Sequence, residues 1–115
     1  MPSNPNDAAP LWDMLDAARA IMDFITEKKA EDYFRDRMLR GAVERHLEII
    51  GEAARGVSES FRAQHPEIPW RRIIGLRNIL AHEYGEIKHE RIWDLVIRDI
   101  PDLIHLLTVL VPPSD

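Results

Sequence analysis

The chain has 115 residues, which predicts one domain large enough to build its own core. It contains no cysteine, which excludes disulfides, thiolate metal sites and cysteine nucleophiles and suits a reducing compartment such as the cytoplasm. The formal net charge of -5 argues against a large basic surface for nucleic acid, but it is compatible with a small local phosphate site.

No stretch of the sequence resembles a membrane-spanning helix or a secretory signal. The most apolar stretch, 103–111, is far shorter than the roughly 20 apolar residues that a spanning helix needs. Residues 1–10 have neither a positive region nor an apolar region of the kind found in signal peptides. We therefore expect a flexible polar leader over residues 1–10 and a single helical domain over residues 11–115.

Two amphipathic helices are predicted in the first half of the chain. The first follows an apolar stripe that begins just after Pro10, and the second runs from near Lys29 to near Gly56. We expect them to lie antiparallel as the backbone of a bundle. The two stripes consist of Leu11, Leu15, Ala18, Met22 and Ile25, and of Leu39, Val43, Leu47, Ile50, Ala54 and Val57.

The second half of the chain is also predicted to be helical. Ser58 is a candidate cap for a short helix over 58–64, and a proline-bracketed loop over 65–69 follows it. A third major helix is expected from residue 69 or 70 to about 82. The last helix is expected from near residue 88, with Pro101 kinking or dividing it. Because no useful β-type alternation occurs, we predict an all-α bundle of four to five helices.

Arg77 interrupts an apolar row in the third predicted helix. On an unbroken helix this row would consist of Trp70, Ile73, Arg77, Leu80 or Ala81, and Tyr84. Arginine is seldom fully buried without a partner. Such an arginine either reaches out to solvent or to a core carboxylate, or it faces a cleft that receives a phosphate.

His82 and Tyr84 follow Arg77 closely, but the spacing alone leaves their roles open. On a regular helix, residues five apart lie about 140° around the axis, so Arg77 and His82 would diverge. They would converge only if the helix ended or tightened before Gly85, or if a second subunit supplied one of them. A histidine at a helix end is ordinarily explained by the helix dipole, and a tyrosine here by packing.

The order Arg77-(four residues)-His82-(one residue)-Tyr84 resembles the R-x4-H-x-Y signature of the HepT toxins in the HEPN superfamily. The resemblance covers roughly residues 11–107. One departure is that relatives often carry an acid early in the final helix, where this chain reads Glu86-Ile87-Lys88-His89. The supporting segments are Ile49-Ile50-Gly51-Glu52-Ala53-Ala54, Pro66-Glu67-Ile68-Pro69-Trp70, Ile74-Gly75-Leu76-Arg77-Asn78, Trp93-Asp94 and Ile100-Pro101-Asp102-Leu103.

The resemblance implies a HEPN-like fold and a metal-independent endoribonuclease that acts as a homodimer or higher oligomer. Arg77 would hold the scissile phosphate, His82 would transfer protons, and Asn78 would support them. Cleavage would proceed by attack of the RNA 2′-hydroxyl and leave a cyclic phosphate. No cofactor, no metal and no DNA substrate are implied.

The resemblance also implies a partner. HepT toxins work with a nucleotidyltransferase antitoxin that resembles MntA, in a type VII-like toxin–antitoxin system. In that system AMP is transferred to the motif tyrosine, which is Tyr84 here. An AMP group at this place would occupy Arg77 and block the cleft.

Other polar residues receive structural interpretations. His46 is expected to be a satisfied core or interface histidine. Glu48 and Glu52 share one helix face and are expected to be solvated or to pair with an arginine. The histidines and acids of residues 65–89 lack any known metal-ligand spacing.

Two alternative functions remain open from the sequence. The chain could be a non-catalytic HEPN module that binds a nucleotide or a nucleotidyltransferase partner. It could also be a purely structural helical dimerisation domain, although that function would leave Arg77 unexplained.

Overall fold

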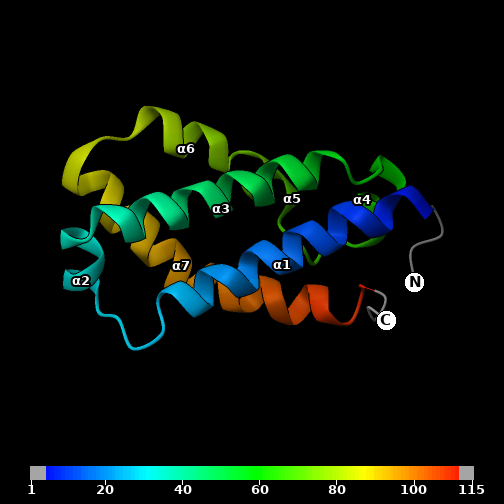
Figure 1. The fold of residues 1–115 in the computed structure, drawn as a ribbon. Coiled ribbons are helices and arrows are strands. Elements are labelled where there is room, and N and C mark those ends of the chain that lie inside the picture. The colour runs from blue at the N-terminus through cyan, green and yellow to red at the C-terminus, as the bar shows by residue number, and fades with distance from the viewer. Residues whose placement is uncertain (1–4, 112–115) are drawn as a thin grey trace.

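The computed structural model describes residues 5–111 and confirms an all-α fold (Figure 1). Seven α-helices and one short 3-10 helix occur over this range, more than the four to five expected, because two of the predicted helices are each divided. The elements are η1 (Pro5–Asp7), α1 (Ala8–Phe24), α2 (Ala30–Arg35), α3 (Arg37–Arg55), α4 (Glu59–Gln64), α5 (Trp70–Ile74), α6 (Leu76–His82) and α7 (Gly85–Thr108).

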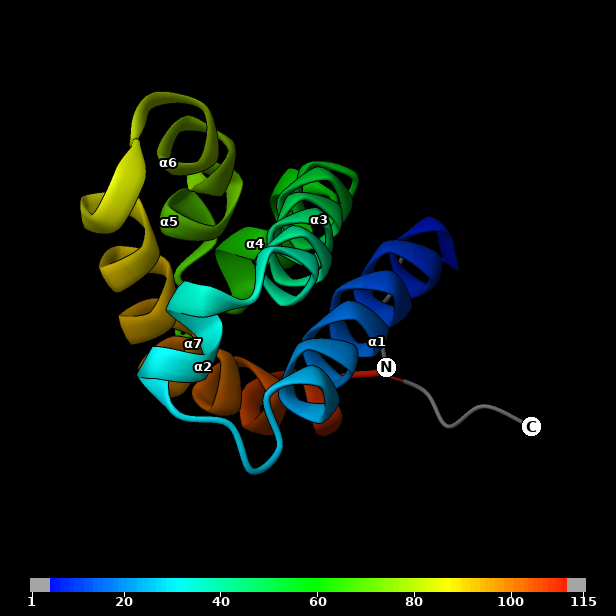
Figure 2. The same ribbon diagram turned by 60° about the vertical axis from the view of Figure 1, so that its left-hand side comes forward.

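Helices α1 and α3 form the antiparallel pair expected from the two apolar stripes (Figures 1 and 2). Helix α7 packs against α1, and the short helix α2 bridges α3 and α7. Helices α5 and α6 pack on α3. Among residues 5–111 no helix combines the length and the apolarity needed to cross a bilayer.

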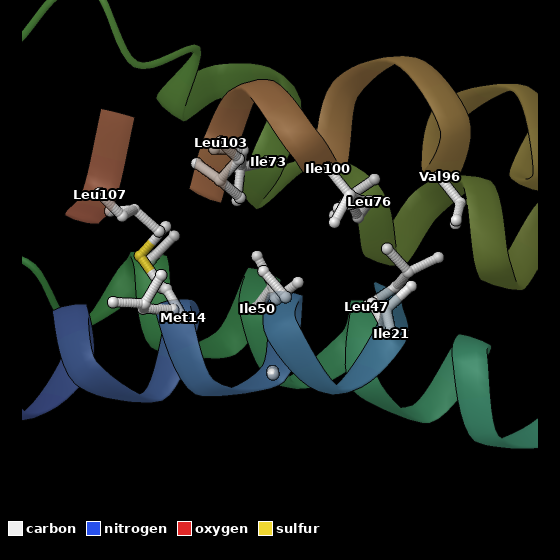
Figure 3. Packing of buried hydrophobic residues seen from close by; sticks show 14 of the residues in the cluster. Met14, Ile21, Leu47, Ile50, Ile73, Leu76, Val96, Ile100, Leu103 and Leu107 are labelled. Carbon is white, nitrogen blue, oxygen red and sulfur yellow. The ribbon is translucent and has the colours of Figure 1, made fainter. Parts of the chain in front are cut away.

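One continuous apolar core joins these helices. Figure 3 shows side chains from α1, α3, α5, α6 and α7 directed into the same space. Burial of these side chains is the main favourable term for folding, at about 25 cal/mol per Å² of apolar surface. The labelled core residues are Met14, Ile21, Leu47, Ile50, Ile73, Leu76, Val96, Ile100, Leu103 and Leu107.

The helix expected from near Lys29 to near Gly56 is divided at Asp36. This residue has an extended backbone, with φ -99° and ψ 99°, and its carboxylate accepts the Leu39 N–H at 3.0 Å to cap α3. Arg40 donates to the carbonyl oxygens of Tyr33 and Phe34 near the end of α2. The predicted apolar stripe begins only at Leu39, and no glycine or proline between Lys29 and Leu39 marks this break in the sequence.

The helical region begins earlier than the sequence predicted. Helix α1 starts at Ala8, and Asp7 is 1% exposed because its carboxylate accepts the backbone N–H and the hydroxyl of Ser58, each at 2.7 Å. The prediction of a flexible leader is therefore wrong for residues 7–10, which this buried contact ties to α4. Residues 1–4 lie outside the described range.

Ser58 caps α4 as expected, since its hydroxyl accepts the Phe61 N–H at 3.2 Å. Helix α7 begins at Gly85 rather than near Lys88 and remains one helix through Pro101. In Figures 1 and 2 this helix bends along its length. The proline therefore does not divide the helix, although it lacks the N–H that an interior residue would donate.

Gly51 allows helices α5 and α6 to approach α3 closely. A Cβ atom at this position would lie 3.2 Å from the carbonyl oxygen of Ile73 and 4.0 Å from the Cβ of Leu76. Gly41, on the same helix, has no atom within 4 Å of its corresponding position. Gly51 thus sets the distance between the central helix α3 and the helices that follow the loop over 65–69.

The two glycines provide a matched test of this contact. We expect Gly41→Ala to raise the free energy of unfolding by about 0.5–1 kcal/mol, because alanine is the better helix former. Gly51→Ala should give no such gain, since its methyl group meets backbone that must move. Urea denaturation of both variants measures the difference, and an equal stabilisation by both would contradict the proposed close packing.

Candidate functional site

The segment that carries Arg77 is two short helices rather than one. The chain turns at Gly75, whose N–H donates to the Arg71 carbonyl at 3.0 Å and whose own carbonyl accepts the Asn78 N–H at 3.0 Å. After this turn Leu76 is buried and Arg77 is exposed. The prediction that Arg77 stands on an apolar row is therefore wrong, because the row of an unbroken helix does not continue past Gly75.

The loop before α5 fixes where this segment begins. The indole Nε1 of Trp70 donates to the carbonyl oxygen of His65 at 2.9 Å, and the ring packs edge-on against Phe61. The imidazole of His65 in turn contacts the carboxylate of Glu67 at 3.0 Å. The tryptophan that follows the second proline thus anchors the first turn of α5 to the preceding helix.

Arg77, Asn78 and His82 all lie on α6 with exposed side chains. Within residues 5–111 none of the three side chains makes a hydrogen bond or an ion pair. Because α6 is helical from Leu76 to His82, the ideal angle of about 140° between Arg77 and His82 applies. The two side chains are therefore presented to solvent in different directions by one copy of the chain.

Tyr84 lies in a two-residue connection between α6 and α7, which we call the connector (Glu83–Tyr84). Its side chain is 78% exposed. Both connector residues are extended, with φ -95° and ψ 147° at Glu83 and φ -136° and ψ 155° at Tyr84. Gly85 then has φ +62°, a value that L side chains rarely adopt, and begins α7.

Two ion pairs hold the connector and the first turn of α7. Arg91 pairs with Glu83, and the Lys88 ammonium lies 2.8 Å from a carboxylate oxygen of Glu44 on α3. The second pair is largely buried, with side chains 19% and 25% exposed. Sequence reasoning missed both pairs, because their partners are too far apart in sequence for a helical spacing rule to identify them.

Tyr33, the other tyrosine of the sequence, has the opposite environment. It is fully buried, and rings of Phe34, His89 and Trp93 lie around it. Burial raises the pKa of its hydroxyl well above the ordinary value, and the Glu44 carboxylate adds to this shift while Arg40 opposes it. Tyr33 is therefore a neutral core residue, and Tyr84 is the tyrosine that a macromolecule can reach.

A groove of about 760 Å³ runs between the α5–α6 segment and α7. Its apolar lining includes Ile73, Leu76, Ile79, Leu95 and Leu103. The arginines that line it are neutralised by carboxylates, in the pairs Arg72–Asp99, Arg98–Asp94 and Arg91–Glu83. The groove thus offers apolar surface beside α6 rather than an unpaired positive charge.

The remaining candidates have structural surroundings. His46 Nδ1 contacts the Ala42 carbonyl at 2.8 Å, and its ring meets Phe24 edge-on, which confirms a satisfied histidine. Glu48 pairs with Arg45, and Glu52 is exposed. Over the described residues 5–111, no group of three or more histidines and carboxylates is arranged to hold a metal ion.

Comparison with known proteins identifies related sequences. Residues 14–110 match a family model described as ribonuclease HepT-like. Over 93 residues the chain is 39% identical to a protein of Methanocaldococcus jannaschii named as a candidate RNase, covering 81% of this chain and 85% of that protein. It is 40% identical to a protein of Thermococcus cleftensis named as a candidate ribonuclease HepT, covering 81% and 84% of the two chains. No solved structure gives a significant match.

The positive φ of Gly85 can be tested by substitution. We expect Gly85→Ala to lower the free energy of unfolding by about 1–2 kcal/mol, because the left-handed conformation strains an L residue even where space is open. Gly85→Asn should cost less, since asparagine tolerates this conformation better. Urea denaturation compares the two variants, and an alanine variant as stable as the wild type would rule out a required positive φ.

Proposed function

Because the chain belongs to the HepT-like ribonuclease family, we propose that it is an RNA-cleaving enzyme whose active centre is Arg77 and His82 on α6. The observation that carries this proposal is the exposure of an unpaired arginine and a histidine on one short helix, in the order of the R-x4-H-x-Y signature. Arg77 forms no ion pair with the carboxylates of its own chain, so its guanidinium is available to an anionic substrate.

The proposed chemistry uses the RNA itself as the nucleophile. The 2′-oxygen attacks the neighbouring phosphorus and loses its proton, the bond to the 5′-oxygen breaks, and that oxygen takes up a proton. His82 transfers these protons, since an imidazole can both accept and donate a proton. Arg77 binds the phosphate and stabilises the charge that develops on its oxygens, and Asn78 supports it. No step requires a metal ion.

We propose that two copies of the chain complete the site. On one copy Arg77 and His82 diverge by about 140°, so a single α6 cannot easily place both on one phosphate. A second copy would bring another Arg77 and another His82 to the same cleft. The apolar groove beside α6 and the exposed side chains of Tyr84 and Ile87 support an interface near the motif.

We further propose that a nucleotidyltransferase antitoxin resembling MntA regulates the enzyme in a type VII-like toxin–antitoxin system of the cytoplasm. The Tyr84 phenolic oxygen would attack the α-phosphorus of ATP, lose its proton and release pyrophosphate. The 78% exposure of this side chain supports access by a second protein. The added phosphate would compete with RNA for Arg77 and repel the RNA backbone.

Cleavage without metal is the first test. We expect the purified unmodified protein to cleave a mixed RNA pool in excess EDTA and to leave 2′,3′-cyclic phosphate ends. Arg77→Ala and His82→Ala should each lower the cleavage rate by at least about 100-fold, the lower range for loss of acid–base catalysis. Both side chains are exposed, so circular dichroism should show unchanged helix content.

Matched controls separate the site from general charge effects. Arg71→Ala and His105→Ala also remove an exposed arginine and an exposed histidine, and we expect neither to reduce cleavage substantially. Undiminished activity of His82→Ala would reject the assigned catalytic centre. An uncleaved pool, with intact mass showing no adduct on the wild type, would instead favour the non-catalytic nucleotide- or partner-binding module.

Modification should be confined to Tyr84. We expect incubation with the cognate nucleotidyltransferase and ATP to add AMP to the peptide that contains Tyr84 and to abolish RNA cleavage, as peptide mass spectrometry and the cleavage assay would show. The Tyr84→Phe variant should accept no AMP, and Tyr33 should stay unmodified because it is fully buried. AMP found on another residue, or a modified protein that still cleaves RNA, would contradict the regulatory proposal.

A further inference from the structure

The connector (Glu83–Tyr84) follows α6 directly, and its backbone decides where Tyr84 points. The Glu83 N–H donates to the Ile79 carbonyl at 3.1 Å and so completes α6. The Tyr84 carbonyl accepts the Lys88 N–H at 3.4 Å in the first turn of α7. The connector therefore has one backbone hydrogen bond to each helix and is otherwise held only by side chains.

Side chains alternate along an extended segment, so the two connector residues face opposite sides. The Glu83 side chain is 28% exposed and pairs with Arg91, two turns along α7. The Tyr84 side chain is 78% exposed and makes no hydrogen bond or ring contact within residues 5–111. Whatever holds Glu83 toward α7 consequently turns Tyr84 away from it.

We propose that the Glu83–Arg91 ion pair is a positioning pair, which holds the connector so that Tyr84 projects outward and His82 stays at the end of a regular α6. Neither residue needs to touch RNA or nucleotide for this role. The residue between the histidine and the tyrosine of the motif is thus not a mere spacer in this chain. Its carboxylate sets the direction of the tyrosine that follows it.

The largely buried Glu44–Lys88 pair holds the start of α7 independently of the Glu83–Arg91 pair. It fixes the first turn of α7 to α3, while Glu83–Arg91 joins the end of α6 to the second turn of α7. Each pair therefore joins a residue before Tyr84 in the sequence to a residue after it. Loss of the more exposed pair should loosen the connector without unfolding α7, because the buried pair and the apolar core remain.

Amide hydrogen exchange tests the positional claim without any enzyme assay. We expect Arg91→Gln and Glu83→Gln each to speed exchange of the Glu83 and Lys88 amides by about threefold to fivefold at low salt, the range for a partly exposed ion pair. Combining the two substitutions should add little to either. Exchanging the charges, with Glu83→Arg and Arg91→Glu together, should restore slow exchange.

Arg98→Gln is the matched control. Arg98 lies two turns further along α7 and is also paired, but its partner Asp94 belongs to α7 itself rather than to the connector. We expect exchange of the Glu83 and Lys88 amides to remain unchanged in this variant. Unchanged exchange in both Arg91→Gln and Glu83→Gln would overturn the positioning role.

The functional consequence rests on the proposed ribonuclease activity and is measured separately. We expect Arg91→Gln to lower kcat for RNA cleavage by about threefold to fivefold with little change in KM. The reason is that the connector is no longer held in position, while Arg77 still binds the phosphate. The charge-exchanged protein should recover kcat. If the wild type cleaves no RNA, the proposed function fails, while the exchange measurement still decides whether the pair holds the connector.

Discussion

The interruption of the helical segment at Gly75 sets the start of α6, the short helix that carries Arg77, Asn78 and His82. On one unbroken helix, Arg77 would follow Trp70 and Ile73 toward the core, where a guanidinium without a partner is costly. The turn instead buries Leu76 and leaves Arg77 in solvent. Gly51 on α3 supports the same arrangement, because its missing side chain admits the Ile73 carbonyl and the Leu76 side chain at close range.

Charge distribution reinforces this geometry. The chain carries more carboxylates than cations, and Arg72, Lys88, Arg91 and Arg98 around α7 are all paired with carboxylates. Three of these pairs join α7 to α5, to the connector and to α3, and the fourth lies within α7. They also leave the groove beside α6 without an unpaired arginine of its own, so the cation that faces solvent at the motif is Arg77.

The regular helices could be predicted from the sequence where buried residues recur with the 3.6-residue period of an α-helix. The stripes beginning at Leu11 and at Leu39 are buried in α1 and α3, and Ser58 caps α4 as expected. The break at Gly75 was missed because apolar spacing continues across it, and the break at Asp36 was missed because no glycine or proline marks it. The start of α1 was missed because Asp7 is buried by a contact with Ser58, far away in the sequence.

The sequence by itself determined the all-α class, the two long antiparallel helices and the order of Arg77, His82 and Tyr84, because these follow from residue type and local spacing. Only the tertiary structure decided that Arg77 and His82 reach solvent on a short separate helix and that Tyr84, unlike Tyr33, is exposed. The physical reason is that burial and ion pairing depend on contacts between distant segments, such as Glu44 with Lys88 and Gly51 with Ile73. No local periodicity encodes those contacts.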